Sequence, residues 1–201
     1  MELESIRHNV VTLSILINSF CHSSPLDFGF SILGEMLKLC VEPNVVTFKT
    51  LMNGLCVEGK FVESVRLFEK MVRDGYEPNL VTYNTIVNGL CQIGRTGDAV
   101  RLLRKIEESA VRPDIVAYNT VIDSLCKDRL IRVAQNIFSE MVGKGILPIV
   151  ISYSSLVQGM SNLGKWEEVK NLLNEMVAMK IKPNMVTYNV LVDAFSKEGR
   201  V

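Results

Sequence analysis

Residues 80–114 read LVTYNTIVNGLCQIGRTGDAVRLLRKIEESAVRPD, and this stretch holds two amphipathic patterns on either side of a short turn. Apolar residues recur at helical spacing in both halves. They are Ile86, Val87, Leu90 and Cys91 in the first half, and Ala99, Leu102, Leu103 and Ile106 in the second. Gly94 stands between them, where a left-handed residue can end a helix. The stretch therefore predicts a helical hairpin.

The same stretch recurs along the chain with a period of 35 residues. Four residue types share that period without an insertion. The columns are Pro43, Pro78, Pro113, Pro148 and Pro183; Cys21, Cys56, Cys91 and Cys126; Met1, Met36, Met71, Met141 and Met176; and Tyr83, Tyr118, Tyr153 and Tyr188. Columns of several types in one register predict a tandem array of identical structural units.

The array divides into blocks that each begin with an aliphatic residue. The five complete blocks are residues 10–44, 45–79, 80–114, 115–149 and 150–184. Residues 1–9 align with the tail of a preceding block, and residues 185–201 with the first helix of a sixth. One hairpin cannot bury its apolar stripes alone, but stacked hairpins bury them against each other. We predict an all-α fold, a right-handed α-solenoid (superhelix) of about eleven helices with first helices on its concave face.

Local signals place the ends of these helices. Hydroxyl residues near the block starts are the expected N-caps of first helices, and glycines supply the turn between helices. The expected caps are Thr12, Thr47, Thr82, Ser152 and Thr187, and the turn glycines are Gly59, Gly94, Gly164 and Gly199. Ser24 followed by Pro25 is expected to start a second helix. The proline near each block's end stops the second helix.

Composition excludes several classes of function. The 22 basic and 22 acidic residues cancel, so any nucleic-acid binding must come from a local stripe rather than a global field. No apolar run reaches the length of a membrane span, and the acidic start is not a targeting peptide. Either the protein is cytosolic or its true N-terminus lies outside this sequence. Five cysteines without a Cys-x-x-Cys pair favour a reducing compartment over a disulfide framework.

Catalysis, metals and cofactors find little support in the residues. There is no zinc-deaminase signature and no glycine-rich phosphate loop, and the histidines are only His8 and His22. We expect no enzyme, no cofactor and no metal. The cysteine column invites a metal reading, but Ser161 and Ser196 replace cysteine in the same register, which favours packing. The tyrosine column is likewise interpreted as packing between helices rather than base stacking.

The repeat resembles the pentatricopeptide repeat family, in its pure-repeat class and similar to restorer-of-fertility-like plant proteins. The resemblance rests on Leu80-Val81-Thr82-Tyr83-Asn84-Thr85, on Asn88-Gly89-Leu90-Cys91, on Gly94-Arg95, on Arg112-Pro113-Asp114 and on Met185-Val186-Thr187-Tyr188-Asn189. It covers the whole chain, which looks like a fragment of a longer array. The tetratricopeptide repeat has a period of 34 and a Trp-x-x-Leu-Gly-x-x-Tyr signature, and neither occurs here.

The resemblance implies single-stranded RNA bound at one base per repeat, read by two or three side chains. The fifth and last residues of a block would read the base edge, and the second would sandwich the base. The implied readers are Ser14, Asn44, Lys49, Asn79, Asn84, Asp114, Asn119, Ile149, Ser154, Asn184 and Asn189; the implied sandwich residues are Val11, Val46, Val81, Val116, Ile151 and Val186. From the residues alone, without the resemblance, the same Asn, Asp and Ser side chains are better interpreted as helix caps.

Family resemblance also implies which bases are preferred. Ser14 with Asn44, and Ser154 with Asn184, imply adenine. Asn84 with Asp114 implies uracil. Asn119 with Ile149 implies a weak pyrimidine bias, as does Asn189 in the incomplete sixth block. Lys49 with Asn79 departs from the family pattern and leaves the base unresolved.

The implied role is post-transcriptional control of organellar transcripts by passive occupancy, affecting processing, stability or translation. We expect a monomer that binds single-stranded RNA, with possible protein partners in organellar RNA metabolism and no membrane. Mitochondria are the implied location, with the chloroplast as the alternative. Two other functions stay open: a protein–protein scaffold on the same concave surface, and a module that recruits an enzyme.

Overall fold

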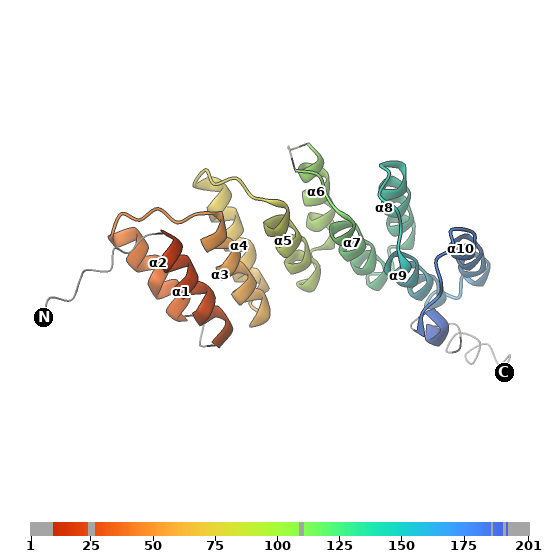
Figure 1. The fold of residues 1–201 in the computed structure, drawn as a ribbon. Helices are drawn as coiled ribbons and strands as arrows, with labels where there is room; N and C mark the ends of the chain where they lie inside the picture. Colours follow the sequence, from red (N-terminus) through yellow and green to blue (C-terminus); the bar gives the residue numbers. More distant parts are fainter. Residues whose placement is uncertain (1–9, 24–26, 109–110, 186, 191, 193–201) are drawn as a thin grey trace, which may run out of the picture. The chain divides into compact units, whose positions relative to one another are not determined.

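The computed structural model describes residues 10–23, 27–108, 111–185, 187–190 and 192, and this part of the chain contains helices and no strands (Figure 1). Residues 185, 187–190 and 192 are helical, in addition to ten helices whose bounds are assigned. These are α1 (Val10–Ser23), α2 (Asp27–Lys38), α3 (Val45–Val57), α4 (Phe61–Arg73), α5 (Leu80–Gln92), α6 (Thr96–Glu107), α7 (Ile115–Lys127), α8 (Ile131–Gly143), α9 (Val150–Ser161) and α10 (Trp166–Ala178). The all-α prediction is confirmed for these residues.

The chain divides into two compact units, residues 1–93 and 94–201. In the first unit α1, α3 and α5 pack side by side, while α2 packs on α1 and α3, and α4 on α3 and α5. In the second unit α7 and α9 pack side by side, α8 lies against both, α6 packs on α7, and α10 on α9. The first unit thus stacks the hairpins α1–α2 and α3–α4 and ends with α5. The second unit begins with α6 and stacks the hairpins α7–α8 and α9–α10. In each unit the odd-numbered first helices share one layer. The hand of the superhelix stays a prediction.

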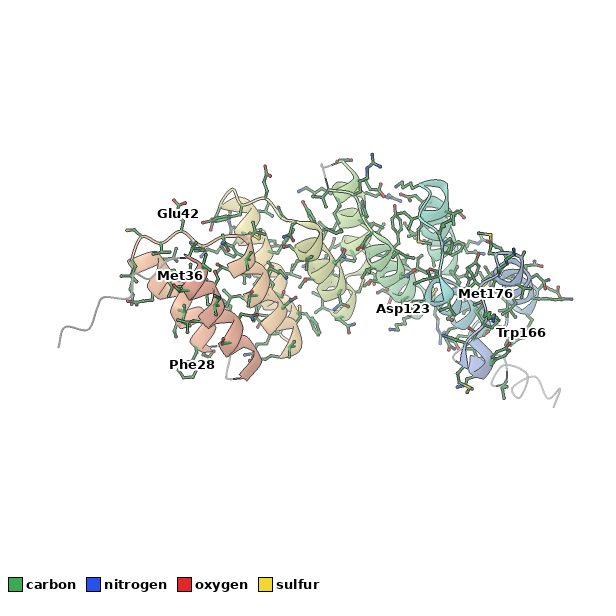
Figure 2. All side chains as sticks on the ribbon, in the orientation of Figure 1. Phe28, Met36, Glu42, Asp123, Trp166 and Met176 are labelled. Atoms are coloured by element: carbon green, nitrogen blue, oxygen red, sulfur yellow. The ribbon has the colours of Figure 1, made fainter. Side chains whose placement is uncertain are left out.

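Columns of apolar side chains that revealed the period also form the core. Met36 from α2 and Met176 from α10, both labelled in Figure 2, are fully buried. Met71, Ile106 and Met141 occupy the equivalent sites on the other second helices and are equally buried. Burying such a side chain stabilises the fold by about 1.5–3 kcal/mol. This column of four methionines and Ile106 therefore marks the inner face of the second helices.

The first helices begin directly after the last residue of the preceding block, which we call the closing residue. Asn44 is the N-cap of α3, and its Oδ1 accepts a hydrogen bond from the backbone N–H of Thr47 at 3.0 Å. Asn79 and Asp114 cap α5 and α7 in the same way, whereas Ile149 gives α9 no side-chain cap. Because such a cap contributes about 1 kcal/mol, the closing residues have a structural role.

The N-caps predicted from the sequence are wrong. Thr47, Thr82, Ser152 and Thr187 are each the third residue of a helix, and Thr12 lies inside α1. The threonine hydroxyls instead turn back toward the cap: Thr47 Oγ1 donates to Asn44 Oδ1 at 3.2 Å. The physical reason is that the closing residue has extended backbone, with φ −121° and ψ 176° at Asn44, while Thr47 is already helical.

The turns inside the hairpins match the glycine prediction where they are described. Gly59, Gly94 and Gly164 have φ of +73°, +73° and +67°, in the left-handed region that glycine adopts without steric cost. The fourth block has no glycine there, and Arg129 takes the same conformation with φ 61°. Gly199 and the pair Ser24 and Pro25 lie outside the described residues.

The tyrosine column packs between helices, as predicted, at three of its four positions. Tyr118 and Tyr153 are fully buried, and Tyr83 nearly so. The ring of Tyr83 meets Phe68 of α4 edge-on, with 5.8 Å between centroids, an arrangement favourable for aromatic pairs. Tyr188, in contrast, is 54% exposed.

A polar cluster joins the ends of α6, α7 and α8 within the second unit. Lys144 pairs with Glu107 and with Glu140, the latter at 2.6 Å. The Tyr118 hydroxyl donates to Glu107 Oε1 at 2.5 Å. Burial alone would raise the pKa of Glu107, but hydrogen bonds from Lys144 and Tyr118 outweigh it and hold the pKa below its usual value. Glu107 therefore stabilises the folded state in its ionised form.

Glu107→Gln is expected to lower the free energy of unfolding at pH 7 by up to about 1 kcal/mol. A carboxyl group with a lowered folded-state pKa adds stability above its unfolded pKa, about 4.3, and loses it as the pH falls through the folded value. In urea titrations, the difference in free energy of unfolding between wild type and variant should therefore shrink as the pH falls below about 4.3. Glu69→Gln, at an exposed site on α4, is the control. A gap that stays constant with pH contradicts this role.

Candidate nucleic-acid interface

In each of the two units, a stripe of exposed aliphatic side chains follows the first helices. Each lies at the second position of a block, and the fourth residue of the same block is buried. The stripe consists of Val11, Val46, Val81, Val116 and Ile151, which are 58%, 54%, 48%, 54% and 54% exposed. Val186 lies outside the described residues. Exposed apolar groups repeated on one side of a layer mark a contact surface rather than a core.

The fifth residues of the blocks lie beside this stripe at different depths. Ser14, Asn119 and Ser154 are 7–8% exposed. Lys49 and Asn84 are half-buried, and Asn189 is exposed. All six were predicted to read bases. The structure places the three most buried ones against the next repeat, where each forms a hydrogen bond.

Those hydrogen bonds run from the fifth residue of one block to the third residue of the next. Ser14 Oγ lies 2.8 Å from Thr47 Oγ1, and Ser154 Oγ lies 3.0 Å from Thr187 Oγ1. Asn119 Oδ1 accepts from Ser152 Oγ at 2.7 Å. The third residue was assigned only a capping role from the sequence, so this contact was missed. The sequence feature that could have indicated this contact is a serine or threonine 33 residues after the fifth residue.

The closing residues are caps, and they also border open space. Asn44 and Asn184 use their Oδ1 atoms to accept from the backbone N–H groups of Thr47 and Thr187, both at 3.0 Å. Their amide nitrogens stay available because a cap engages only the oxygen. Capping and reading are therefore compatible roles for one asparagine.

One cavity in the first unit brings the predicted residues of two blocks together. It has a volume of about 390 Å³ and lies between α1 and α3. Its lining comprises Val11, Ser14, Ile15, Asn18, Asn44, Val46, Lys49 and Thr50. Two aliphatic residues of the stripe, a pair predicted to read a base and the next block's Lys49 thus share one space. Its size falls within the roughly 300–1,000 Å³ of small-ligand sites.

A second cavity, in the second unit, repeats this arrangement. It has a volume of about 320 Å³. It is lined by Asp123, Ile151, Ser154, Ser155, Gln158 and Asn184; Figure 2 labels Asp123 on α7. The stripe residue Ile151 again lies together with Ser154 and Asn184, the pair predicted to read a base. Both cavities hold the Ser and Asn pairing, one in each unit.

Sequence reasoning missed the sixth and ninth residues of the blocks, which line the same cavities. Ser155 Oγ donates to Asp123 Oδ1 at 3.3 Å, and Thr85 Oγ1 donates to Asn53 Oδ1 at 3.1 Å. Asp123 also pairs with Lys127 at 2.6 Å, which offsets its charge. The available signal was a polar column at 35-residue spacing: Asn18, Asn53, Asn88, Asp123 and Gln158.

The described residues contain no group of three or more His, Cys, Asp or Glu placed to hold a metal ion. Cys126 is buried, and burial, reinforced by Asp123, raises the pKa of its thiol to about 12. Cys56 is half-buried, and burial raises its thiol pKa as well. Neutral thiols against apolar neighbours fit the packing interpretation of this column. No helix in the described part of the chain is long and apolar enough to cross a membrane.

A family model described as the PPR repeat family matches residues 8–57, 43–92, 79–116, 113–162 and 148–197. Two Arabidopsis thaliana pentatricopeptide repeat-containing proteins, one named mitochondrial and one putative and mitochondrial, are 51% and 48% identical over 43 residues. That stretch covers 21% of this chain and 7% of each relative.

Solved structures share the fold over nearly the whole chain. The maize pentatricopeptide repeat protein PPR10 matches with a TM-score of 0.83 and 28% identity, over 95% of this chain and 27% of that one. PPR10 in complex with an 18-nucleotide psaJ RNA element matches with a TM-score of 0.77 at the same identity, over 96% and 28%. Arabidopsis nuclear proteinaceous RNase P 2 matches at 15% identity with a TM-score of 0.81, over 94% and 43%, and shows the fold alone. The α-solenoid class is confirmed, and the chain spans about a quarter of the PPR10 chain.

Proposed function

The chain belongs to the pentatricopeptide repeat family, and on this premise we propose that it binds single-stranded RNA, one base per repeat, across the surface of its first helices. The observation that carries the proposal is the pair of cavities beside the aliphatic stripe. Each is lined by a stripe residue, a fifth residue and a closing residue: Val11, Ser14 and Asn44 in one, and Ile151, Ser154 and Asn184 in the other.

The chemistry of these cavities suits an unstacked base. A planar base has two apolar faces and a polar edge, and a single strand exposes both. Val11 and Val46, both half exposed, line the first cavity and would cover the faces. Ser14 and Asn44 would meet the edge. The structural neighbour PPR10 is solved in complex with an 18-nucleotide psaJ RNA element, which supports RNA as the ligand.

The proposed readout follows the repeats as the sequence divides them. Ser14 with Asn44, and Ser154 with Asn184, select adenine. Asn84 with Asp114 selects uracil. Asn119 beside the apolar Ile149 favours a pyrimidine, and so does Asn189. Lys49 lines the first cavity as a half-buried cation, so it contacts a phosphate rather than a base edge.

Binding alone is the proposed activity of these repeats. By occupying a single-stranded site the chain would block a nuclease, remodel a hairpin or expose a translation start. Arabidopsis relatives are named mitochondrial, which supports action on mitochondrial transcripts. Fluorescent tagging of the full-length protein tests the location: mitochondrial signal is expected, and chloroplast signal contradicts it.

Salt dependence separates RNA binding from a protein scaffold on the same surface. Affinity for a single-stranded RNA of the proposed order should fall with salt, with a log–log slope of about −0.7 per phosphate neutralised. Lys49→Met should make that slope shallower by about 0.7. Lys38→Met, an exposed change at the end of α2, is the matched control and should leave the slope unchanged.

The proposal fails if affinity is independent of salt, or if duplex RNA binds as tightly as the single strand. Capture of a protein ligand that competes with RNA and ignores salt would establish the scaffold function instead.

A further inference from the structure

In the first and fifth blocks, the fifth residue, the closing residue and the third residue of the next block form one hydrogen-bonded triad. Thr47 Oγ1 lies between Ser14 Oγ at 2.8 Å and Asn44 Oδ1 at 3.2 Å. Thr187 Oγ1 lies between Ser154 Oγ and Asn184 Oδ1, at 3.0 Å from each. The two triads occur in separate units with the same chemistry, so the arrangement is a repeated feature of the fold.

The direction of every hydrogen bond in the Thr47 triad follows from counting protons. Asn44 Oδ1 also accepts from the Thr47 backbone N–H at 3.0 Å, which identifies that atom as the amide oxygen. An oxygen of this kind only accepts, so the single proton of Thr47 Oγ1 must point to it. Ser14 is left to donate its own proton to Thr47 Oγ1. The backbone N–H of Asn44 donates to the same hydroxyl at 3.4 Å, which completes its capacity of one donor and two acceptors.

What the triad leaves for a ligand is fixed in polarity. Ser14, whose proton is used, can offer only lone pairs to the cavity. Asn44, whose oxygen is used, can offer only the N–H groups of its amide. A serine and an asparagine that could each donate or accept are thereby reduced to one acceptor and one donor. The Thr187 triad imposes the same polarity on Ser154 and Asn184.

The fourth block shows what happens when the closing residue cannot accept. Ile149 has no polar side-chain atom. Its backbone N–H donates to Ser152 Oγ at 3.1 Å. The Ser152 proton goes to Asn119 Oδ1 at 2.7 Å. Asn119 keeps both of its amide N–H groups and one lone pair of Oδ1, so it is not restricted to a single polarity. The closing residue thus decides whether the hydroxyl of the following block donates to the closing residue, as Thr47 does, or to the fifth residue, as Ser152 does.

We infer that the third residue of the following block, here Thr47 and Thr187, is a specificity-determining residue of the first and fifth repeats, acting by fixing their readers as one acceptor and one donor. This rests on the proposed function, and it adds a positioning residue to the reader pair. Adenine presents an amino donor beside a ring acceptor, which the fixed pair complements. Guanine presents a carbonyl acceptor beside an N–H donor. An acceptor would then face an acceptor and a donor would face a donor.

Thr47→Val tests the inference because valine keeps the shape of the fully buried threonine and removes only the hydroxyl. Ser14 would regain a free proton and could donate to a guanine carbonyl. We expect the preference for adenine over guanine at the first base to fall about tenfold, the equivalent of one relieved hydrogen-bond mismatch. Thr47→Ser restores the hydroxyl and should restore the preference.

The measurement is competition between two fluorescent single-stranded RNAs, identical except for adenine or guanine at the first base, on the full 201-residue chain. The ratio of the two affinities in one sample is independent of the folded fraction, so partial loss of stability does not obscure it. Thr82→Val is the matched control: it removes the same cap hydroxyl from Asn79, at 2.9 Å, in a repeat whose fifth residue is Lys49. It should leave the first-base ratio unchanged.

Three results overturn the inference. An unchanged adenine-to-guanine ratio in Thr47→Val, with wild type selective, shows that Thr47 is only a cap and leaves the proposed function standing. Equal loss of selectivity in Thr47→Ser points to packing of the methyl group. RNA binding by wild type without any preference at the first base removes both the inference and the proposed function. Thr187→Val provides an independent repetition at the fifth base.

Discussion

Gly159→Ala is expected to lower the free energy of unfolding by about 1–2 kcal/mol, whereas Gly89→Ala, at the equivalent site two blocks earlier, is expected to raise it by about 0.5–1 kcal/mol. Both glycines are buried in the last turn of a first helix, Gly159 in α9 and Gly89 in α5. Alanine is the better helix former by about 0.8–1 kcal/mol. The opposite signs therefore come from what the added methyl group meets.

At Gly159 a Cβ atom would lie 2.6 Å from Ile131 Cδ1 and 2.8 Å from Cys126 Cβ. The isoleucine terminus can rotate away, but Cys126 Cβ is fixed to the backbone of α7. Relief therefore requires α7 and α9 to separate, and overpacking of this kind costs about 1–3 kcal/mol. At Gly89 the nearest atoms, on Val65 and Phe61, lie at 3.9 and 4.0 Å, ordinary contact distances.

Urea unfolding followed by helical circular dichroism measures both variants. Equal shifts for the two glycines would show that the close approach of α9 to Cys126 does not constrain the fold. Ser124 stands at the equivalent position of the fourth block. A side chain larger than hydrogen is therefore accommodated at this position in at least one repeat. Close packing at Gly159 is therefore a local property of one repeat junction.

The helical hairpins could be predicted because the spacing of apolar residues identifies the buried face of each helix. Met36 and Met176 stand at the same step of the repeat and are both fully buried. Gly59 and Gly94 mark turns because the left-handed conformation narrows the choice of residue. These features depend on neighbours within one block, so a periodic sequence reveals them.

The helix starts were harder to predict because two good capping residues lie three positions apart. Asn44 and Thr47 both have short polar side chains, and each could cap α3. The deciding property is the extended backbone of Asn44. Pro43 does not decide between them, because a proline holds the residue before it, Glu42, in extended backbone and leaves the residue after it free.

The contacts of the reader residues could not be predicted, because they depend on how adjacent hairpins stack. Ser14 meets Thr47 across 33 residues, a spacing that differs from the period. Asn119 meets Ser152 at the same separation with a different direction of donation. Residue types reveal which groups can bond, whereas the register between two helices decides which do.

Exchanging one reader pair for another is expected to change the preferred base at one position only. Asn84→Ser with Asp114→Asn gives the third block the pair found in the first and fifth blocks. Both new residues suit their sites: asparagine caps helices as well as aspartate does, and serine already occupies the fifth position in two blocks. The preference at the third base should move from uracil to adenine by about 1–3 kcal/mol, the usual value of a specific base contact.

A matched control makes the same two changes of residue type away from the surface of the first helices. Asn136→Ser with Asp128→Asn alters exposed residues, one on α8 and one just after α7. Base preference should be unaffected at all positions. Any change there would mean that net charge, rather than the reader pair, determines selectivity.

The most direct test of base reading by these repeats is therefore the ratio of affinities for two single-stranded RNAs that differ only by uracil or adenine at the third base. Wild type is predicted to prefer uracil, and the Asn84→Ser, Asp114→Asn protein to prefer adenine, with unchanged preferences for adenine at the first and fifth bases. If both proteins prefer the same third base, or if the exchange weakens both RNAs equally, the closing and fifth residues are helix caps and packing groups, and the repeats do not read bases.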